Sequence, residues 1–196
     1  MATDSVPKLA FPESGQSMLE TALLLPFLLF VALNAINLGY FFFVALNLAA
    51  APRHGVEYSI QGFQTPGTGS LPNAGPSCSG STSETSVGTL TYNDMIGVLP
   101  APATPCPNIA SVQVCTLLNG VSNPGTTTQR ANCTAYGPAT TFPNADPDPE
   151  APYFMLHRVD VQYTVTPLIP GGAGNFFSLF LPPLTFHRQV SMRALE

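Results

Sequence analysis

The chain has 196 residues and a formal net charge of −5, and only 9% of its residues are charged, against about 25% in typical soluble domains. Its only lysine, Lys8, lies near the N-terminus, and the sequence contains no basic cluster. These features argue against nucleic-acid binding, and the length fits one small domain with an anchor or with long loops.

The N-terminal part predicts a membrane helix. Residues 1–14 are mostly polar, whereas the stretch from Thr21 to Ala51 contains no Asp, Glu, Lys, Arg or His. A secretory signal would have an apolar core of only about 7–15 residues, with a cleavage site after it. We therefore expect a retained helix, because Thr21 to Phe43 would make about 34 Å of helix, enough to cross a hydrocarbon core of roughly 30 Å.

Several residues modify this helix. Pro26 removes a helical hydrogen bond, so we expect a kink there. Asn34 and Asn37 are three residues apart and share a face, which predicts contact with another helix; the alternative is that both side chains bond back to their own backbone. Beyond Val44 we expect the helix to continue to about Ile60, with Pro52 tolerated if a new helical turn begins there.

The start of the helix carries a processing motif. Gly15 is followed by Gln16-Ser17-Met18-Leu19-Glu20, which resembles a type IV prepilin site with cleavage after the glycine and Glu at the fifth mature position. Together with Pro26, Ile36–Tyr40 and Asn47–Tyr58, this segment resembles the N-terminal part of TadE-like pseudopilins. That family belongs to the tight-adherence (Tad) pilus and secretion machinery.

The resemblance implies chemistry performed on this chain. A prepilin peptidase would cut between Gly15 and Gln16, and the glycine leaves the backbone open because it has no side chain. Glu20 would then pair with the new amine at Gln16 on a neighbouring subunit, which would offset part of the cost of a carboxylate at the membrane edge. The alternative is that Glu20 reaches the lipid headgroups.

The cysteines predict an oxidising compartment. All four follow the apolar run, in a region rich in Pro, Gly, Ser and Thr: Cys78, Cys106, Cys115 and Cys133. An even number in this setting predicts two disulfides, with three pairings possible; the alternative is free buried thiols. No Cys-x2-Cys spacing is present, so we expect no structural zinc site.

The middle of the chain predicts loops between short elements. Residues 62–90 are expected to form an extended loop, and residues 91–99 a short helix capped by Thr91. Residues 109–118 predict a strand with Val112, Val114, Thr116 and Leu118 on one face and Cys115 on the other. Residues 119–152 are expected to be a loop, and its acidic run at 144–150 to be solvated rather than a calcium site, because it lacks the EF-hand spacing.

The C-terminal part gives the clearest strand signals. Apolar and polar residues alternate from Arg158 to Thr166, which predicts a half-buried antiparallel strand. Residues 184–195 predict a second strand, with Phe186, Val190, Met192 and Ala194 on one face. The apolar loop around Phe177 between them either covers the core or forms a contact patch. Val159–Tyr163 and the terminal Met192-Arg193 also resemble the end of TadE-like proteins.

No motif for catalysis is present: the sequence has no Gly-x-Ser-x-Gly elbow, no His-Glu-x-x-His pair and no phosphate-binding loop. We expect no enzymatic activity and no cofactor, and we expect the three histidines to be structural. The predicted fold is α+β: a leader at 1–15, a transmembrane and extension helix at 16–60, and a disulfide-containing exoplasmic domain at 61–196 with a small antiparallel sheet and long Pro/Gly-rich loops.

The resemblance implies a minor pseudopilin-like structural subunit. Its partners would be the prepilin peptidase, other pilin or pseudopilin subunits, the pilus assembly platform and the membrane. It would cross the bacterial inner membrane once, with the C-terminal domain periplasmic or extracellular, or stand in a surface pilus. The alternative is a membrane-tethered adhesin or binding module that is not part of a pilus.

Overall fold

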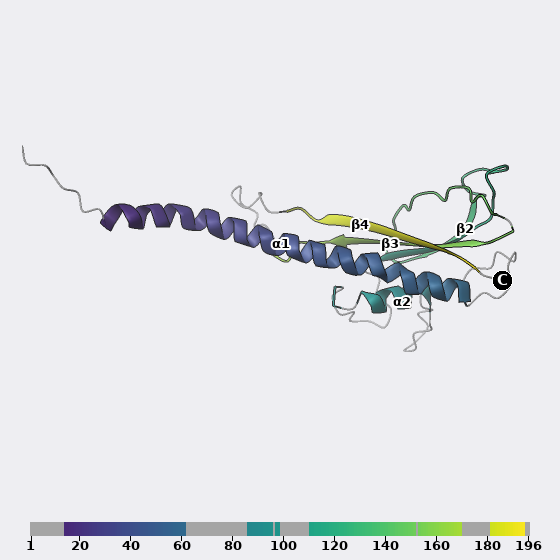
Figure 1. The fold of residues 1–196 in the computed structure, drawn as a ribbon, viewed down its shortest axis with the longest axis horizontal. Coiled ribbons are helices and arrows are strands. Elements are labelled where there is room, and N and C mark those ends of the chain that lie inside the picture. The colour runs from purple at the N-terminus through teal and green to yellow at the C-terminus, as the bar shows by residue number, and fades with distance from the viewer. Residues whose placement is uncertain are drawn as a thin grey trace, which may run out of the picture.

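The computed structural model describes residues 14–61, 86–95, 97–98, 110–151, 153–169 and 181–194. It confirms the α+β prediction, since one long helix packs along a four-stranded antiparallel sheet (Figure 1). The elements in chain order are α1 (Ser14–Gln61), α2 (Val87–Asp94), β1 (Ser111–Leu117), β2 (Ala131–Tyr136), β3 (Leu156–Val165) and β4 (Leu184–Arg193). The expectations for Cys78, Cys106 and the loop around Phe177 lie outside the described residues.

Helix α1 is continuous over 48 residues and includes both Pro26 and Pro52. It ends at Gln61, close to the predicted end of the extension. Pro52 lies on the buried side of the helix, where its missing N–H cannot donate to the carbonyl of Leu48. This half of α1 packs against α2, β3 and β4.

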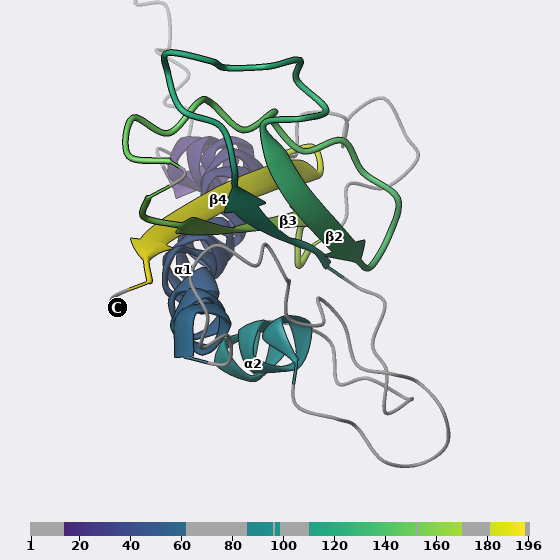
Figure 2. The ribbon, with the colours of Figure 1, turned by 90° about the vertical axis from the view of Figure 1, so that its right-hand side faces the viewer.

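The C-terminal half of α1 forms the core together with the sheet. Its buried apolar residues recur every three to five positions and so lie on one side of the helix: Phe41, Val44, Leu48, Ala51 and Val56. They pack against the inward side chains of β1 and β3, and against the partly buried Phe186, Val190 and Met192 of β4. Figure 2 shows α1 on one face of the sheet and the loops that follow β1 and β2 on the other.

The sheet order is β2-β1-β3-β4, and every neighbouring pair is antiparallel. The alternation predicted for β3 is confirmed, because Val159, Val161, Tyr163 and Val165 are all buried toward α1. The predicted β1 is also confirmed: Val112 and Val114 belong to the core with α1, while Cys115 belongs to a second cluster with Leu117 and Ala145.

Strand β2 corrects the prediction of a loop over residues 119–152. Its six residues, Ala-Asn-Cys-Thr-Ala-Tyr, are exposed or half-buried, and the apolar positions that alternate with Asn and Thr hold only small side chains, so the strand signal is weak. The strand exists because it pairs along β1 from Val112 with Tyr136 to Leu117 with Ala131. An edge strand of this kind depends on its partner more than on its own composition.

Helix α2 begins earlier than predicted. Ser86, not Thr91, is the N-cap, and its hydroxyl accepts a hydrogen bond from the Thr89 amide at 3.1 Å. Thr91 lies inside the helix, where its hydroxyl donates to the carbonyl of Val87 at 2.8 Å. Gly55 allows α2 to approach α1, since a Cβ at that position would lie 2.9 Å from Thr91 Oγ1.

Candidate assembly helix and its anchoring sheet

The N-terminal half of α1 exposes apolar side chains around its whole circumference. Ten large ones are at least 48% exposed: Met18, Leu19, Leu23, Leu24, Leu25, Phe27, Leu28, Leu29, Val31 and Ile36. Six of them fall at positions 23–25 and 27–29, and steps of about 100° per residue spread those six over all sides of the helix. A helix that is apolar on every side requires a membrane or a protein partner.

The length and composition of α1 would let it cross a membrane. Only 6% of its most apolar 18-residue stretch is buried within the structure, whereas a core helix would be mostly buried. Figure 1 shows the N-terminal end of α1 extending beyond the sheet. The fold thus separates a projecting apolar segment from a globular part.

Among the described residues, Asn37 is the first buried position of α1. Its side-chain amide donates to the carbonyl of Ile169 at 3.1 Å, and its side-chain oxygen accepts from the Ile169 amide at 2.9 Å. Asn34 instead donates to the carbonyl of Phe30, one turn earlier, at 3.0 Å. Asn37 therefore fastens α1 to the start of the β3–β4 connection, and Asn34 bonds to its own backbone, as the alternative expected. Contact of this face with another helix stays a prediction.

The other residues of the processing motif lie in the first turns of α1. Gly15 and Gln16 begin the helix after Ser14, and Glu20 follows on an exposed part of it. Thr21 donates to the carbonyl of Ser17 at 2.9 Å. Pro26 lies about 1.7 turns beyond Glu20, within the projecting segment.

One side of the projecting segment is hollowed. A shallow apolar groove of about 560 Å³ is lined by residues at helical spacing: Thr21, Leu24, Leu25, Leu28, Leu29 and Ala32. The small side chains of Thr21 and Ala32 stand at its two ends, and the leucines form ridges between them. Ridges and grooves of this kind are the surface through which helices pack on one another.

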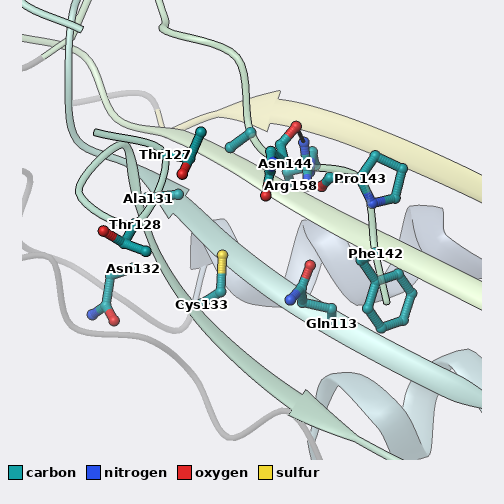
Figure 3. A pocket seen from close by; sticks show the side chains of 11 residues that line it. Gln113, Thr127, Thr128, Ala131, Asn132, Cys133, Phe142, Pro143, Asn144 and Arg158 are labelled. Carbon is teal, nitrogen blue, oxygen red and sulfur yellow. Dashed lines mark hydrogen bonds between the residues drawn. The ribbon is translucent and has the colours of Figure 1, made fainter. Parts of the chain in front are cut away.

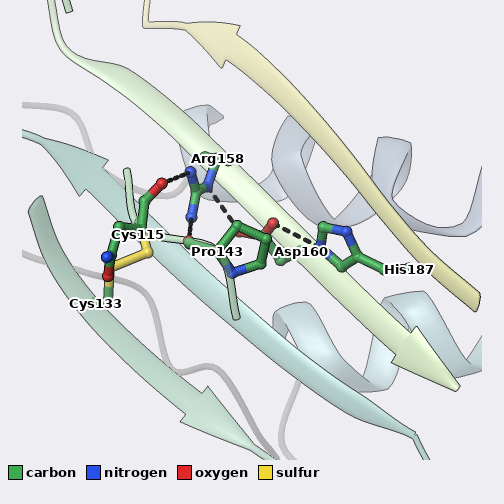
Figure 4. Close-up of a disulfide and its surroundings, with 7 residues drawn as sticks. Cys115, Cys133, Pro143, Arg158, Asp160 and His187 are labelled. Atoms are coloured by element: carbon green, nitrogen blue, oxygen red, sulfur yellow. Dashed lines mark hydrogen bonds and ion pairs between the residues drawn. A yellow bond between two sulfur atoms is a disulfide. The ribbon is translucent and has the colours of Figure 1, made fainter. Parts of the chain in front are cut away.

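A disulfide joins β1 to β2 in the globular part. Cys115 and Cys133 are directly opposite in the register, with Cα atoms 4.2 Å apart, and their sulfurs are bonded (Figure 4). The prediction of disulfides is thus confirmed for this pair. The bond fixes an exposed edge strand to the strand that carries the core.

The outer face of β3 carries a buried polar centre that the sequence did not reveal. Arg158 Nε lies 2.7 Å from Asp160 Oδ2, and His187 Nε2 of β4 lies 3.0 Å from Asp160 Oδ1 (Figure 4). Arg158 also donates to the carbonyl of Pro143 at 2.7 Å. The alternation predicts that this face meets solvent, but the loop before β3 covers it, and Arg158 and His187 both hydrogen-bond to the buried Asp160.

The acidic run is only partly solvated, because Asp146 and Glu150 are exposed whereas Asp148 is buried. Asp148 is 2% exposed and accepts two hydrogen bonds from Arg193 of β4, at 2.9 Å from Nη1 and 2.7 Å from Nη2. Arg193 Nε also lies 2.9 Å from Glu150 Oε2. The loop is therefore bound to the end of the last strand through Arg193. Met192, the residue before Arg193, packs on the core.

The histidines each have a partner within the fold. His54 of α1 lies 2.7 Å from Asp94 of α2, and His157 of β3 lies 2.6 Å from the hydroxyl of Ser59. Burial lowers the pKa of His157, because the protein interior disfavours the charged imidazolium. With His187 on Asp160, the three side chains link α1 to α2, α1 to β3, and β4 to β3.

In comparisons with known proteins, the chain matches no family model, no curated protein and no solved structure.

Proposed function

We propose that the chain is a minor pseudopilin-like structural subunit of a Tad-type pilus or secretion assembly. A prepilin peptidase would remove residues 1–15, and α1 would cross the bacterial inner membrane once before it packs with other pilin helices. The sheet domain would lie on the periplasmic or extracellular side, where its disulfide is stable.

The observation that carries this proposal is the division of α1 into two halves. From Ser17 to Ile36 the helix is apolar on every side and projects from the sheet, whereas from Asn37 to Gln61 it is part of the core. Burying one fully exposed Leu or Phe side chain is worth about 1.5–3 kcal/mol, so the projecting segment supplies a large driving force for membrane insertion and helix packing. The groove from Thr21 to Ala32 offers a place for a neighbouring helix.

Glu20 would set the register of assembly. It is the single acid in a segment that otherwise carries no charge from Ser17 to Pro52. Cleavage after Gly15 would create a positive amine at Gln16, and pairing of that amine with Glu20 of a neighbouring subunit would offset the cost of each charge in a low-dielectric environment.

Processing is tested by the intact mass of protein extracted from membranes of cells that contain a prepilin peptidase. The wild-type chain should lack Met1–Gly15, and Gly15→Leu should retain them. Gly39→Leu is the matched control: a Cβ at Gly39 meets no atom within 4 Å, so this variant should be processed. A wild-type mass that still includes the leader would refute processing.

Assembly is tested with Glu20→Ala, which should be processed but should not co-purify with pilus components. Glu57→Ala is the control, since Glu57 is the other acid of α1 and lies beside the sheet domain. A free-standing adhesin, the second candidate, would not co-purify even as the wild-type chain. Equal recovery of pilus components with both variants would contradict the role of Glu20.

A further inference from the structure

A polar hollow lies on the face of the sheet opposite α1. It has a volume of about 400 Å³ and opens between β1, β2 and the loop that precedes β3 (Figure 3). The lining comes from β1, the β1–β2 loop, β2, the loop before β3 and β3 itself, chiefly Gln113, Thr128, Cys133, Phe142, Asn144 and Arg158. Its size falls within the range of roughly 300–1,000 Å³ found for small-molecule sites.

The walls of this hollow are held in place by covalent and buried polar contacts. The Cys115–Cys133 disulfide fixes β2, whose Ala131 and Cys133 line the hollow, to β1. Arg158 fixes the opposite wall, because it donates to the carbonyl of Pro143 at 2.7 Å and to that of Asn144 at 3.4 Å. A site formed before its ligand arrives loses less conformational entropy on binding.

The charge of the hollow is compensated within the protein. Arg158 is the only charged residue among the described residues that line it, and its guanidinium is paired with the fully buried Asp160 at 2.7 Å. An anionic ligand would therefore find no unpaired cation on this wall. An apolar ligand is disfavoured as well, because it would bury amide and hydroxyl groups without hydrogen-bond partners.

The remaining groups match a ligand that is rich in hydroxyls. Gln113 and Asn144 each carry an amide that both donates and accepts, and the Thr128 hydroxyl, which lies 3.0 Å from that of Thr126, does the same; sugar hydroxyls have this dual character. Phe142 adds one aromatic ring at the end of the hollow near Gln113, and the ring is braced by His187 with centroids 6.1 Å apart. A ring beside amide groups can take the apolar C–H face of a sugar while the amides take its hydroxyls.

We propose that this hollow binds a neutral saccharide unit. Such a site would give the outer face of the domain a binding activity separate from the helix at its other face. The inference does not depend on the pilus role, because it uses only residues of the sheet and of the loops on its outer face.

The test is saturation-transfer NMR on the full chain in lipid nanodiscs, which avoid detergents with sugar headgroups. The probes are the methyl glycosides of glucose, galactose, mannose and N-acetylglucosamine, with affinities taken from titration. At least one probe should bind the wild-type chain. Gln113→Leu and Asn144→Ala should each weaken that binding about fivefold or more, the effect of one lost hydrogen bond.

Gln162→Leu is the matched control, because Gln162 is a half-buried glutamine of β3 on the same face of the sheet but outside the hollow. It should bind like the wild-type chain. Asn144 is exposed and keeps its backbone carbonyl in the alanine variant, so this variant decides the question if Gln113→Leu fails to fold. No saturation transfer from any probe, or equal weakening by Gln162→Leu, would overturn the proposal.

Discussion

The contact between Arg193 and Asp148 gives the sharpest test of how the sheet domain is held together. Replacing Arg193 with methionine keeps the apolar length of the side chain but removes both hydrogen bonds to a carboxylate that is 2% exposed. An unpaired buried charge costs about 3–5 kcal/mol. Because the Arg193 side chain is 31% exposed, water screens part of the pair, and we expect a loss near 3 kcal/mol.

A loss of this size should lower the transition temperature of the domain by about 6–12 °C, at roughly 2–4 °C per kcal/mol for a chain of this size. Near-ultraviolet circular dichroism follows the aromatic side chains of the domain and measures that temperature. Arg188→Met is the control in the same strand, since Arg188 is exposed and bonds only to the carbonyl of its neighbour among the described hydrogen bonds. Its transition should move by no more than about 2 °C.

The double variant Asp148→Asn, Arg193→Met removes the buried charge along with its partner and should recover part of the lost stability. Equal shifts for Arg193→Met and Arg188→Met would refute the reasoning. They would mean that the acidic loop does not depend on the terminal strand.

Two further outcomes follow from the same domain. Replacing Cys115 and Cys133 with alanine opens a loop of 18 residues and should cost about 3 kcal/mol, seen as a lower urea midpoint; an unchanged midpoint would contradict the bracing role of the disulfide. The pKa of His157 in the folded chain lies below its ordinary 6.5, so as the pH falls the unfolded chain takes up this proton before the folded chain does. The free energy of unfolding should therefore be highest above pH 6.5 and fall as the pH drops below it. His157→Asn should make this decline shallower, and an unchanged slope would rule out His157 as its source.

In Met192-Arg193, the sequence pattern predicts the face of one side chain but not the partner of the other. Successive side chains of a strand point to opposite faces, so the alternation of β4 predicts that Met192 faces the core. The structure confirms this prediction. The partner of Arg193 could not be predicted. Asp148 lies 45 residues earlier, in a run whose prolines and acids are also typical of a solvated loop.

The same limit explains the polar centre on β3. Arg158 and Asp160 occupy the positions that an alternating pattern assigns to solvent, and nothing local to them distinguishes a covered face from an open one. Only the position of residues 143 and 144 over the strand buries them. Strand β2 was missed for a related reason, since pairing with β1 rather than its own composition makes it a strand.

The sequence by itself determined the long apolar helix, the strands β1, β3 and β4, and the side of each strand that faces the core. These features depend on the periodicity of neighbouring residues, which any window of the chain contains. Only the tertiary structure decided where the projecting segment of α1 ends and the part that packs on the sheet begins. Asn37 could have faced a partner helix or its own backbone, and it meets Ile169, 132 residues away. Contacts at such separation depend on how the whole chain packs, so they are fixed only when the helix and the sheet come together.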